Sequence, residues 1–88
     1  MKFKARIEVR LKKDELDPEA DTVKKSLIDL NFQVSQVKVA KIYEVVVEAP
    51  TKKDAESTAK SICSRLLVNP TKDEYKAEVE EVGAPSKS

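Results

Sequence analysis

Side chains that commonly carry catalysis are scarce in this chain of 88 residues. It has no histidine, and its single cysteine is Cys63. Without histidine, neither a Ser-His nor a Cys-His nucleophile pair can form, and no Cys/His cluster can bind zinc. A general base that works near neutral pH would have to be a carboxylate or a lysine with a shifted pKa. We therefore predict no catalytic residue and no metal site in this chain.

Phosphate-binding chemistry is scarce as well. The sequence has one glycine, Gly83, so it cannot build a glycine-rich loop around the phosphates of ATP. Charged residues make up 38 % of the chain, yet the formal net charge is only +1. A protein that binds nucleic acid by neutralising phosphates usually carries a clear basic excess. The composition therefore favours a protein that acts through its surfaces.

The sequence has the character of a small intracellular domain. Its N-terminal stretch, MKFKARIEV, alternates charged and apolar residues and lacks the apolar run of a signal peptide. No segment is long enough to span a bilayer, and one cysteine cannot form an internal disulfide. We expect a cytoplasmic protein with a single domain over residues 1–82 and no membrane contact. Residues 83–88, GAPSKS, have nothing to bury and are expected to form a flexible tail.

The first half of the chain predicts a strand and then a helix. Residues 2–12 alternate between apolar and charged side chains, as in a strand with one buried face. Asp17 stands at an N-cap position and Pro18 at the first helical position. Asn31 is a suitable left-handed terminator for this helix. The expected inward face recurs at three- and four-residue spacing and consists of Ala20, Val23, Leu27 and Leu30.

The second half predicts two tightly joined strands, a second helix and a last strand. Residues 34–40 and 42–49 are rich in β-branched side chains. Thr51 and Asp54 have the spacing of a capping box, and Asn69-Pro70 ends the helix. Residues 75–82 alternate again as a strand. The inward stripe expected for this second helix consists of Ala55, Ala59, Ile62 and Leu66.

The element order β-α-β-β-α-β predicts an α+β fold. Its simplest closed form is a four-stranded antiparallel sheet with both helices on one face, the ferredoxin-like arrangement. On the open face, the basic side chains of the first strand would lie opposite glutamates of the two adjacent strands. These glutamates would neutralise the positive charge of the basic stripe. No aromatic residue interleaves with that stripe, because Phe3 and Tyr43 belong to the inward sets, and this disfavours RNA binding. The same face carries three apolar residues that we predict to form an oligomer interface, namely Ile42, Val46 and Val82.

Three stretches in order resemble the PurS family, the small subunit of phosphoribosylformylglycinamidine (FGAM) synthase. They are Leu16-Asp17-Pro18, the strand from Val39 to Glu48, and LLVNP at 66–70 followed by Tyr75. The resemblance covers residues 3–82. Many members of the family have glycine where this chain has Ala20 and Ala40. A glycine at position 40 would allow a sharper turn between strands two and three, so the geometry of that turn is left open.

The resemblance implies a non-catalytic subunit in purine biosynthesis. In this family PurS brings together PurQ, a glutaminase that releases ammonia, and PurL, the ATP-dependent amidotransferase. It also implies that ATP and Mg²⁺ are used by PurL rather than by this chain, and that the chain forms dimers that can pair into tetramers. Besides their roles at helix ends, six residues are candidates for partner contact, namely Leu16, Asp17, Pro18, Asn69, Pro70 and Tyr75.

Two other classes of function stay open from the sequence. One is a regulatory module with the same β-α-β-β-α-β order, which binds small molecules such as amino acids at subunit interfaces. Such modules usually have flexible, glycine-bearing loops at the site, and this chain lacks them before Gly83. The other is the RNA-binding domain that the balanced charge and inward aromatics disfavour.

Overall fold

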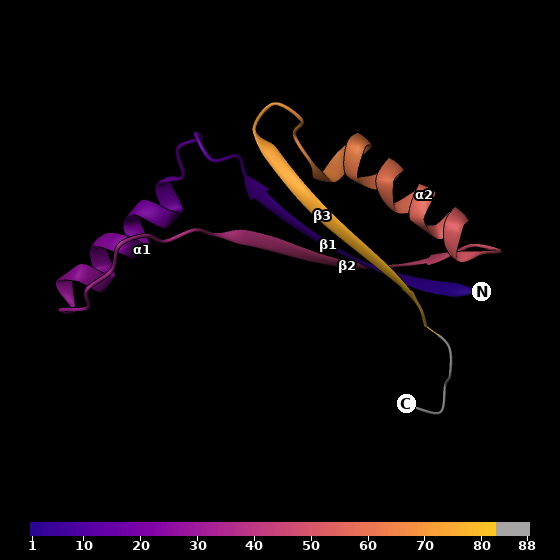
Figure 1. Ribbon diagram of the computed structural model, residues 1–88, viewed down its shortest axis with the longest axis horizontal. Coiled ribbons are helices and arrows are strands. Elements are labelled where there is room, and N and C mark those ends of the chain that lie inside the picture. The colour runs from indigo at the N-terminus through magenta and orange to yellow at the C-terminus, as the bar shows by residue number, and fades with distance from the viewer. Residues whose placement is uncertain (83–88) are drawn as a thin grey trace.

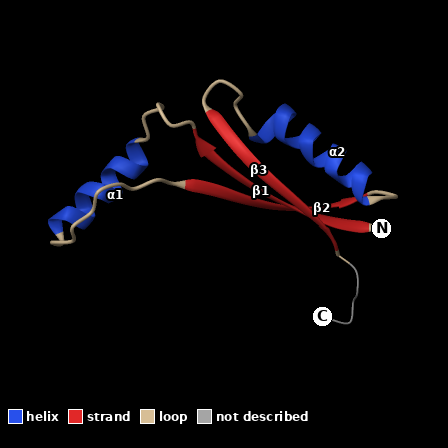
Figure 2. Cartoon of the chain, in the orientation of Figure 1, coloured by secondary structure: helices blue, strands red, loops and turns tan. Residues whose placement is uncertain are grey.

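The computed structural model describes residues 1–82. The tail expected at residues 83–88 lies outside this described range. The elements in order are β1 (Lys2–Leu11), α1 (Pro18–Asp29), β2 (Ala40–Glu48), α2 (Lys52–Ile62), one turn of π-helix η1 (Cys63–Leu67) and β3 (Asp73–Glu81). Figure 1 shows α2 lying over the sheet and α1 extending away from it. Figure 2 shows the three strands side by side.

Strand β1 lies at the centre of the sheet, whose order is β2-β1-β3 with both neighbours antiparallel. Its alternation is confirmed, because Phe3, Ala5 and Ile7 are buried while the charged residues between them face outward. The outward charges meet opposite charges across the strands. The Nζ atom of Lys4 lies 3.9 Å from a carboxylate oxygen of Glu44 and 3.9 Å from one of Glu80.

The helix ends predicted from the sequence are confirmed. The carboxylate of Asp17 accepts hydrogen bonds from the backbone N–H groups of Glu19, at 3.0 Å, and Ala20, at 3.2 Å. The hydroxyl of Thr51 accepts one from the N–H of Asp54 at 3.1 Å. Asn31 has a φ of 72°, the left-handed conformation expected of a residue that terminates a helix.

Helix α2 packs on the inner face of the sheet, chiefly over β3 and β1. Its contact side carries the small residues Ala55 and Ala59, both buried, which allow a close approach to the strands. Cys63 follows them into the core beside Ile7. Leu66, expected on the same stripe, is instead 81 % exposed. The N–H of Val68 donates to the carbonyl of Cys63, which closes a π-turn. This turn contains one residue more than an α-helical turn, so Leu67 packs against the core in place of Leu66.

The prediction of a four-stranded sheet is wrong for the described chain, which has three strands. Residues 34–39 do not form a strand. They run beside α1, away from the sheet, so their backbone has no neighbouring strand with which to form a ladder (Figure 1). Valines at 34, 37 and 39 favour an extended backbone, but extension alone does not create a strand.

The prediction that both helices cover one face is also wrong. No extensive packing joins α1 to any strand, and Ala20 is its only buried residue. The reason is topological, because β1 and β2 are direct neighbours and Arg10 lies opposite Ala40. The connection therefore leaves and re-enters the sheet at the same end, and nothing carries it across the face (Figure 2).

Candidate partner-binding surface

Cys63, the residue best suited to nucleophilic chemistry, is enclosed in the core. Its side chain is 0 % exposed and packs against the apolar residues of β1 and α2. Burial raises the pKa of the Cys63 thiol, because the thiolate would lose its hydration. At neutral pH the group is thus a protonated, inaccessible thiol that fills space in the core.

Residues 1–82 contain neither a candidate metal site nor a helix that could span a membrane. Within this range, His, Cys, Asp and Glu side chains do not gather in any group of three or more that could hold a metal ion. Neither of its helices combines the length and apolar character that crossing a membrane requires. What the described chain offers is a set of surfaces.

Two loops meet at the end of the sheet where β1 ends and β3 begins. The N–H of Lys12 donates to the carbonyl of Lys72 at 2.7 Å, and the Nζ of Lys12 donates to the carbonyl of Pro70 at 2.9 Å. These bonds hold the loop 12–17 against the loop 68–72. The structure therefore brings both halves of the predicted partner-binding set, Leu16 to Pro18 and Asn69 to Tyr75, to the same end of the sheet.

Asn69 stabilises its own loop through hydrogen bonds to residues 71–73. Its side-chain oxygen accepts from the N–H of Thr71 at 2.9 Å, and its own N–H donates to the carboxylate of Asp73 at 2.9 Å. Its carbonyl accepts from the N–H groups of Lys72 and Asp73 at 3.1 and 2.7 Å. Such local side-chain bonds are typical of tight turns. Asn69 and Asp17 are thus both engaged in local structure.

The apolar members of the predicted partner-binding set are exposed. Leu16 precedes the cap residue Asp17 and is 87 % exposed. Tyr75 is 42 % exposed and, together with Val68 and Pro70, lines a shallow apolar hollow of about 360 Å³. An exposed leucine and a half-open aromatic pocket are features that protein interfaces use as anchors.

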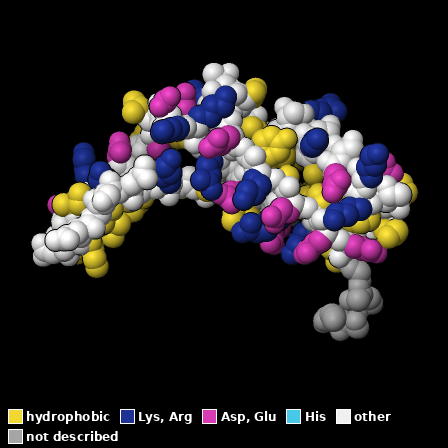
Figure 3. Space-filling view, in the orientation of Figure 1, with side chains coloured by type: hydrophobic (Ala, Val, Ile, Leu, Met, Phe, Trp, Pro, Cys, Tyr) yellow, Lys and Arg dark blue, Asp and Glu magenta, His cyan; other side chains and the backbone are white. Residues whose placement is uncertain are grey.

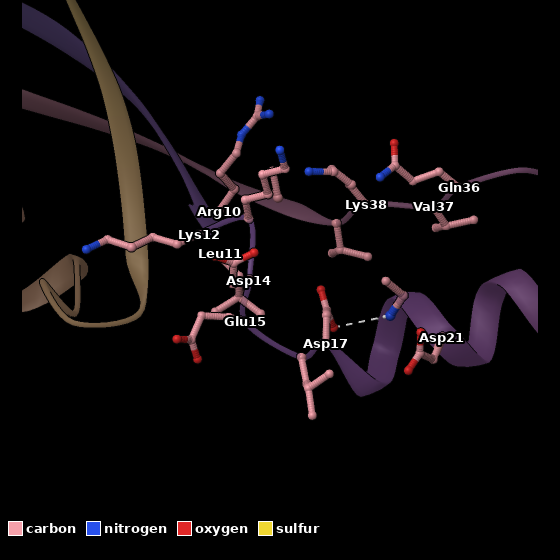
Figure 4. A pocket seen from close by; sticks show the side chains of 15 residues that line it. Arg10, Leu11, Lys12, Asp14, Glu15, Asp17, Asp21, Gln36, Val37 and Lys38 are labelled. Atoms are coloured by element: carbon pink, nitrogen blue, oxygen red, sulfur yellow. Dashed lines mark hydrogen bonds between the residues drawn. The ribbon is translucent and has the colours of Figure 1, made fainter.

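A second hollow, of about 440 Å³, lies between the loop 12–17 and residues 36–40 (Figure 4). Its lining mixes the cations Arg10 and Lys38 with acidic side chains, including Asp17 and Asp21. Lys12 points out of it toward the neighbouring loop (Figure 4). Lys38 was not among the residues singled out from the sequence, because residues 34–40 were expected to form a strand of the sheet.

Two groups of exposed apolar side chains lie away from these loops. Ile42, Val46 and Val82, the predicted oligomer interface, are exposed on the outward face of the sheet, and whether they bind a subunit remains a prediction. The second group follows α1 and the segment after it (Figure 3). Leu30 is 66 % and Phe32 59 % exposed. The exposure of the second group could not be predicted from the sequence, because its helical spacing is that of a helix packed on its own sheet.

Comparison with known proteins gives a consistent picture. Residues 4–81 match the family described as PurS: Phosphoribosylformylglycinamidine (FGAM) synthase. The phosphoribosylformylglycinamidine synthase subunit PurS of Methanocaldococcus jannaschii is 30 % identical over 81 residues, which cover 91 % of this chain and 98 % of that protein.

Solved structures agree with the sequence match. PurS of Thermus thermophilus has a TM-score of 0.83 and 34 % identity, covering 94 % of this chain and 100 % of that one. A chain in the structure of PurLQS from Thermotoga maritima has a TM-score of 0.82 and 30 % identity, covering 91 % and 99 %.

The buried thiol predicts a specific pH dependence of stability. Because the folded-state pKa of Cys63 is raised above its ordinary value of 9.0, its contribution is complete below pH 9.0 and is lost as pH rises through the raised pKa. We expect the difference in free energy of unfolding between the native chain and a Cys63→Ala variant to narrow from about pH 7 to about pH 10. Urea denaturation at both pH values measures it. A difference in free energy of unfolding that stays the same or widens with pH would contradict a raised pKa for the Cys63 thiol.

Proposed function

The chain belongs to the PurS family, and from this premise we propose that it is the small, non-catalytic subunit of FGAM synthase in purine biosynthesis. The observation that carries the proposal is the family match over residues 4–81, which takes in every described helix and strand apart from the first two residues of β1. The reaction converts formylglycinamide ribonucleotide to formylglycinamidine ribonucleotide with ATP and glutamine. ATP and Mg²⁺ act in PurL, and this chain needs no cofactor of its own.

The proposed task is to hold PurQ and PurL together. PurQ releases ammonia from glutamine, and PurL consumes it. Free ammonia becomes ammonium in neutral water and loses the lone pair that makes it a nucleophile, so transfer inside a closed assembly keeps it reactive. A chain with a buried thiol and no histidine suits this task, because a bridge needs surfaces rather than reactive groups.

The end of the sheet where the two loops meet is the surface proposed for PurL or PurQ. Leu16 and Tyr75 supply its exposed apolar contacts, with Pro18 and Pro70 beside them. Asp17 and Asn69 fix the backbone that presents these side chains, through the cap and turn bonds described above. Hydrogen bonds from Lys12 tie the two loops into one surface, so a partner would meet a largely preformed site.

Self-association belongs to the same proposal. A domain this small with so many exposed apolar side chains gains stability by binding a second copy. The outward sheet residues Ile42, Val46 and Val82 are one surface available for this, and they would pair dimers into tetramers. The assembly would work in the cytoplasm, where purine synthesis takes place.

Reconstitution of the synthase tests the bridging role. We expect that leaving this protein out of a mixture with PurL and PurQ abolishes glutamine-dependent synthesis, because ammonia is no longer handed over. Synthesis from added ammonium should persist, since the amidation chemistry resides in PurL. Formation of formylglycinamidine ribonucleotide is measured with each nitrogen source. Unchanged glutamine-dependent activity without this chain would sink the proposal.

A charge at Leu16 tests the proposed docking surface. Leu16→Asp should weaken binding to the partner subunits at least about tenfold, as expected when an apolar anchor is lost. The fold of the free chain should be unaffected, because Leu16 is almost fully exposed. The matched control is Lys53→Asp, at the opposite end of the sheet, which should bind normally. Equal affinity of the two variants, measured by calorimetry or interferometry, would remove this surface from consideration.

A further inference from the structure

Strand β3 lies at one edge of the sheet, and no strand of residues 1–82 pairs with its outer side. It runs antiparallel to β1 over nine residues in an unbroken register, with neither a bulge nor a proline. Proteins commonly protect an exposed edge with such features, because a row of unpaired backbone groups accepts a strand from another chain. The edge of β3 is thus open to strand addition.

The backbone groups that point to this edge follow from the hydrogen bonds at the two ends of the strand. The N–H of Lys12 donates to the carbonyl of Lys72 at 2.7 Å, and the N–H of Val82 donates to the carbonyl of Lys2 at 2.8 Å. A residue of an antiparallel strand bonds to a given neighbour at every second position. The even-numbered residues of β3 therefore bond to β1. The backbone groups that point away from β1 in the middle of the strand are those of Tyr75, Ala77 and Val79.

Both ends of this edge are closed to a partner. The N–H of Asp73 already donates to the carbonyl of Asn69 at 2.7 Å. At the other end Glu81 lies opposite Phe3, on the inward side of the sheet, where a charged side chain discourages pairing with a further strand. Residues 75–79 are left between these ends, and this stretch is close to the usual length of a strand.

A groove of about 770 Å³ lies between β3 and helix α2, which packs over this strand (Figure 1). Residues of β1 do not line it, so it lies on the outer side of β3. Its apolar lining comes from Ala59, Ala77 and Val79, and its charged lining has both signs, as in Glu56 and Lys60. Because side chains alternate along a strand, a strand added to β3 would direct every second side chain into this groove. The groove favours short or apolar side chains there.

The outward side of β3 selects the charge of the added strand. The strand contains five acidic side chains and one lysine. A carboxylate oxygen of Glu80 lies 3.9 Å from the ammonium of Lys4, whereas Glu74 and Glu78 form no ion pair within residues 1–82. Opposite charges across neighbouring strands stabilise a sheet. The strand that fits this edge therefore has basic side chains on its outward side.

A second copy of this chain is a poor occupant of the edge. Two β3 strands side by side would bring the same acidic side chains together, and like charges across neighbouring strands are destabilising. The edge also continues the surface proposed for the partner subunits. Tyr75 lines both the groove beside α2 and the apolar hollow that it shares with Val68 and Pro70. The edge thus suits a strand of a different protein.

We propose that a partner subunit of the synthase adds a short basic strand to the free edge of β3. The backbone groups of Tyr75, Ala77 and Val79 form hydrogen bonds with this strand. Its inward side chains enter the groove beside α2, and its basic outward side chains lie beside Glu74 and Glu78. This inference rests on the bridging function proposed above and specifies one of its contacts.

Amide hydrogen exchange of the isotope-labelled full chain, measured residue by residue by NMR, tests the strand pairing. In the free chain the amides of Ala77 and Val79 should exchange faster than those of Lys76 and Glu78, which bond to β1. Adding PurL and PurQ should slow exchange at Ala77 and Val79 at least about tenfold, because their N–H groups gain partners.

Two outcomes of this measurement would overturn the added strand. One is a complex that forms without slowing exchange at residues 77 and 79. The other is slow exchange at these residues in the free chain that becomes fast on dilution, because a second copy would then occupy the edge.

A matched pair of charge variants tests the recognition independently. Glu78 on β3 and Glu44 on β2 both lie opposite Arg6, so the two replacements disturb the sheet in a similar way. Glu78→Lys should weaken binding to the partner subunits at least about tenfold and reduce its salt dependence, because repulsion replaces attraction. Glu44→Lys should bind as the native chain does. Equal affinities of the two variants, measured by calorimetry at low and high salt, would overturn the proposal.

Failure of the added strand and failure of the bridging role are distinguishable. A native chain that supports glutamine-dependent synthesis with PurL and PurQ, yet shows no slowing at residues 77 and 79, overturns the added strand and leaves the proposed function standing. Slowing of these amides by PurL or PurQ, in a mixture whose glutamine-dependent synthesis does not need this chain, supports the added strand and overturns the bridging role.

Discussion

The main constraint on this structure is that the apolar inner face of its three-stranded sheet must be covered. Within the described chain, that face is covered only in part. Helix α2 covers β3 and β1 through Ala55 and Ala59, and nothing in the described chain covers β2 to the same extent. A two-layer domain needs its apolar sheet face covered across its width. At the same time helix α1, which exposes the apolar side chains of Val23 and Ile28, projects from the end of the same sheet (Figure 1). The protein thus carries both parts of a complete core but does not join them within one chain.

That requirement suits a protein that works by assembly. Its one cysteine is enclosed, and on the outward sheet face the ammonium of Lys4 lies between the carboxylates of Glu44 and Glu80. The described chain exposes apolar surface at three places: the two joined loops, the outward sheet face, and α1 with the segment after it. A subunit that joins two enzymes needs several separate contact surfaces, and exposed apolar patches of this kind mark such contacts.

The sequence predicted local structure well because local structure depends on neighbouring residues. Asp17-Pro18, Thr51 with Asp54, and Asn31 each act through a bond or a backbone angle within a few residues, and all three helix ends were found where expected. Leu66 was misplaced because a π-turn changed the helical phase, which no periodic rule anticipates. Helix α1 was misplaced for a different reason. The spacing of Val23, Leu27 and Leu30 indicates that a face will be buried, but it cannot say which chain will bury it.

Hydrogen exchange of the backbone amides at residues 32–39 tests the central claim most directly. If self-association covers α1 and residues 32–39, these amides should exchange slowly, and their protection should fall as the protein is diluted, because dissociation frees them. Protection in β1 should persist to lower concentration, since its ladder with β2 and β3 lies within one chain. Amides at 32–39 that exchange as fast as an unstructured peptide at every concentration, while β1 is protected, would contradict the account.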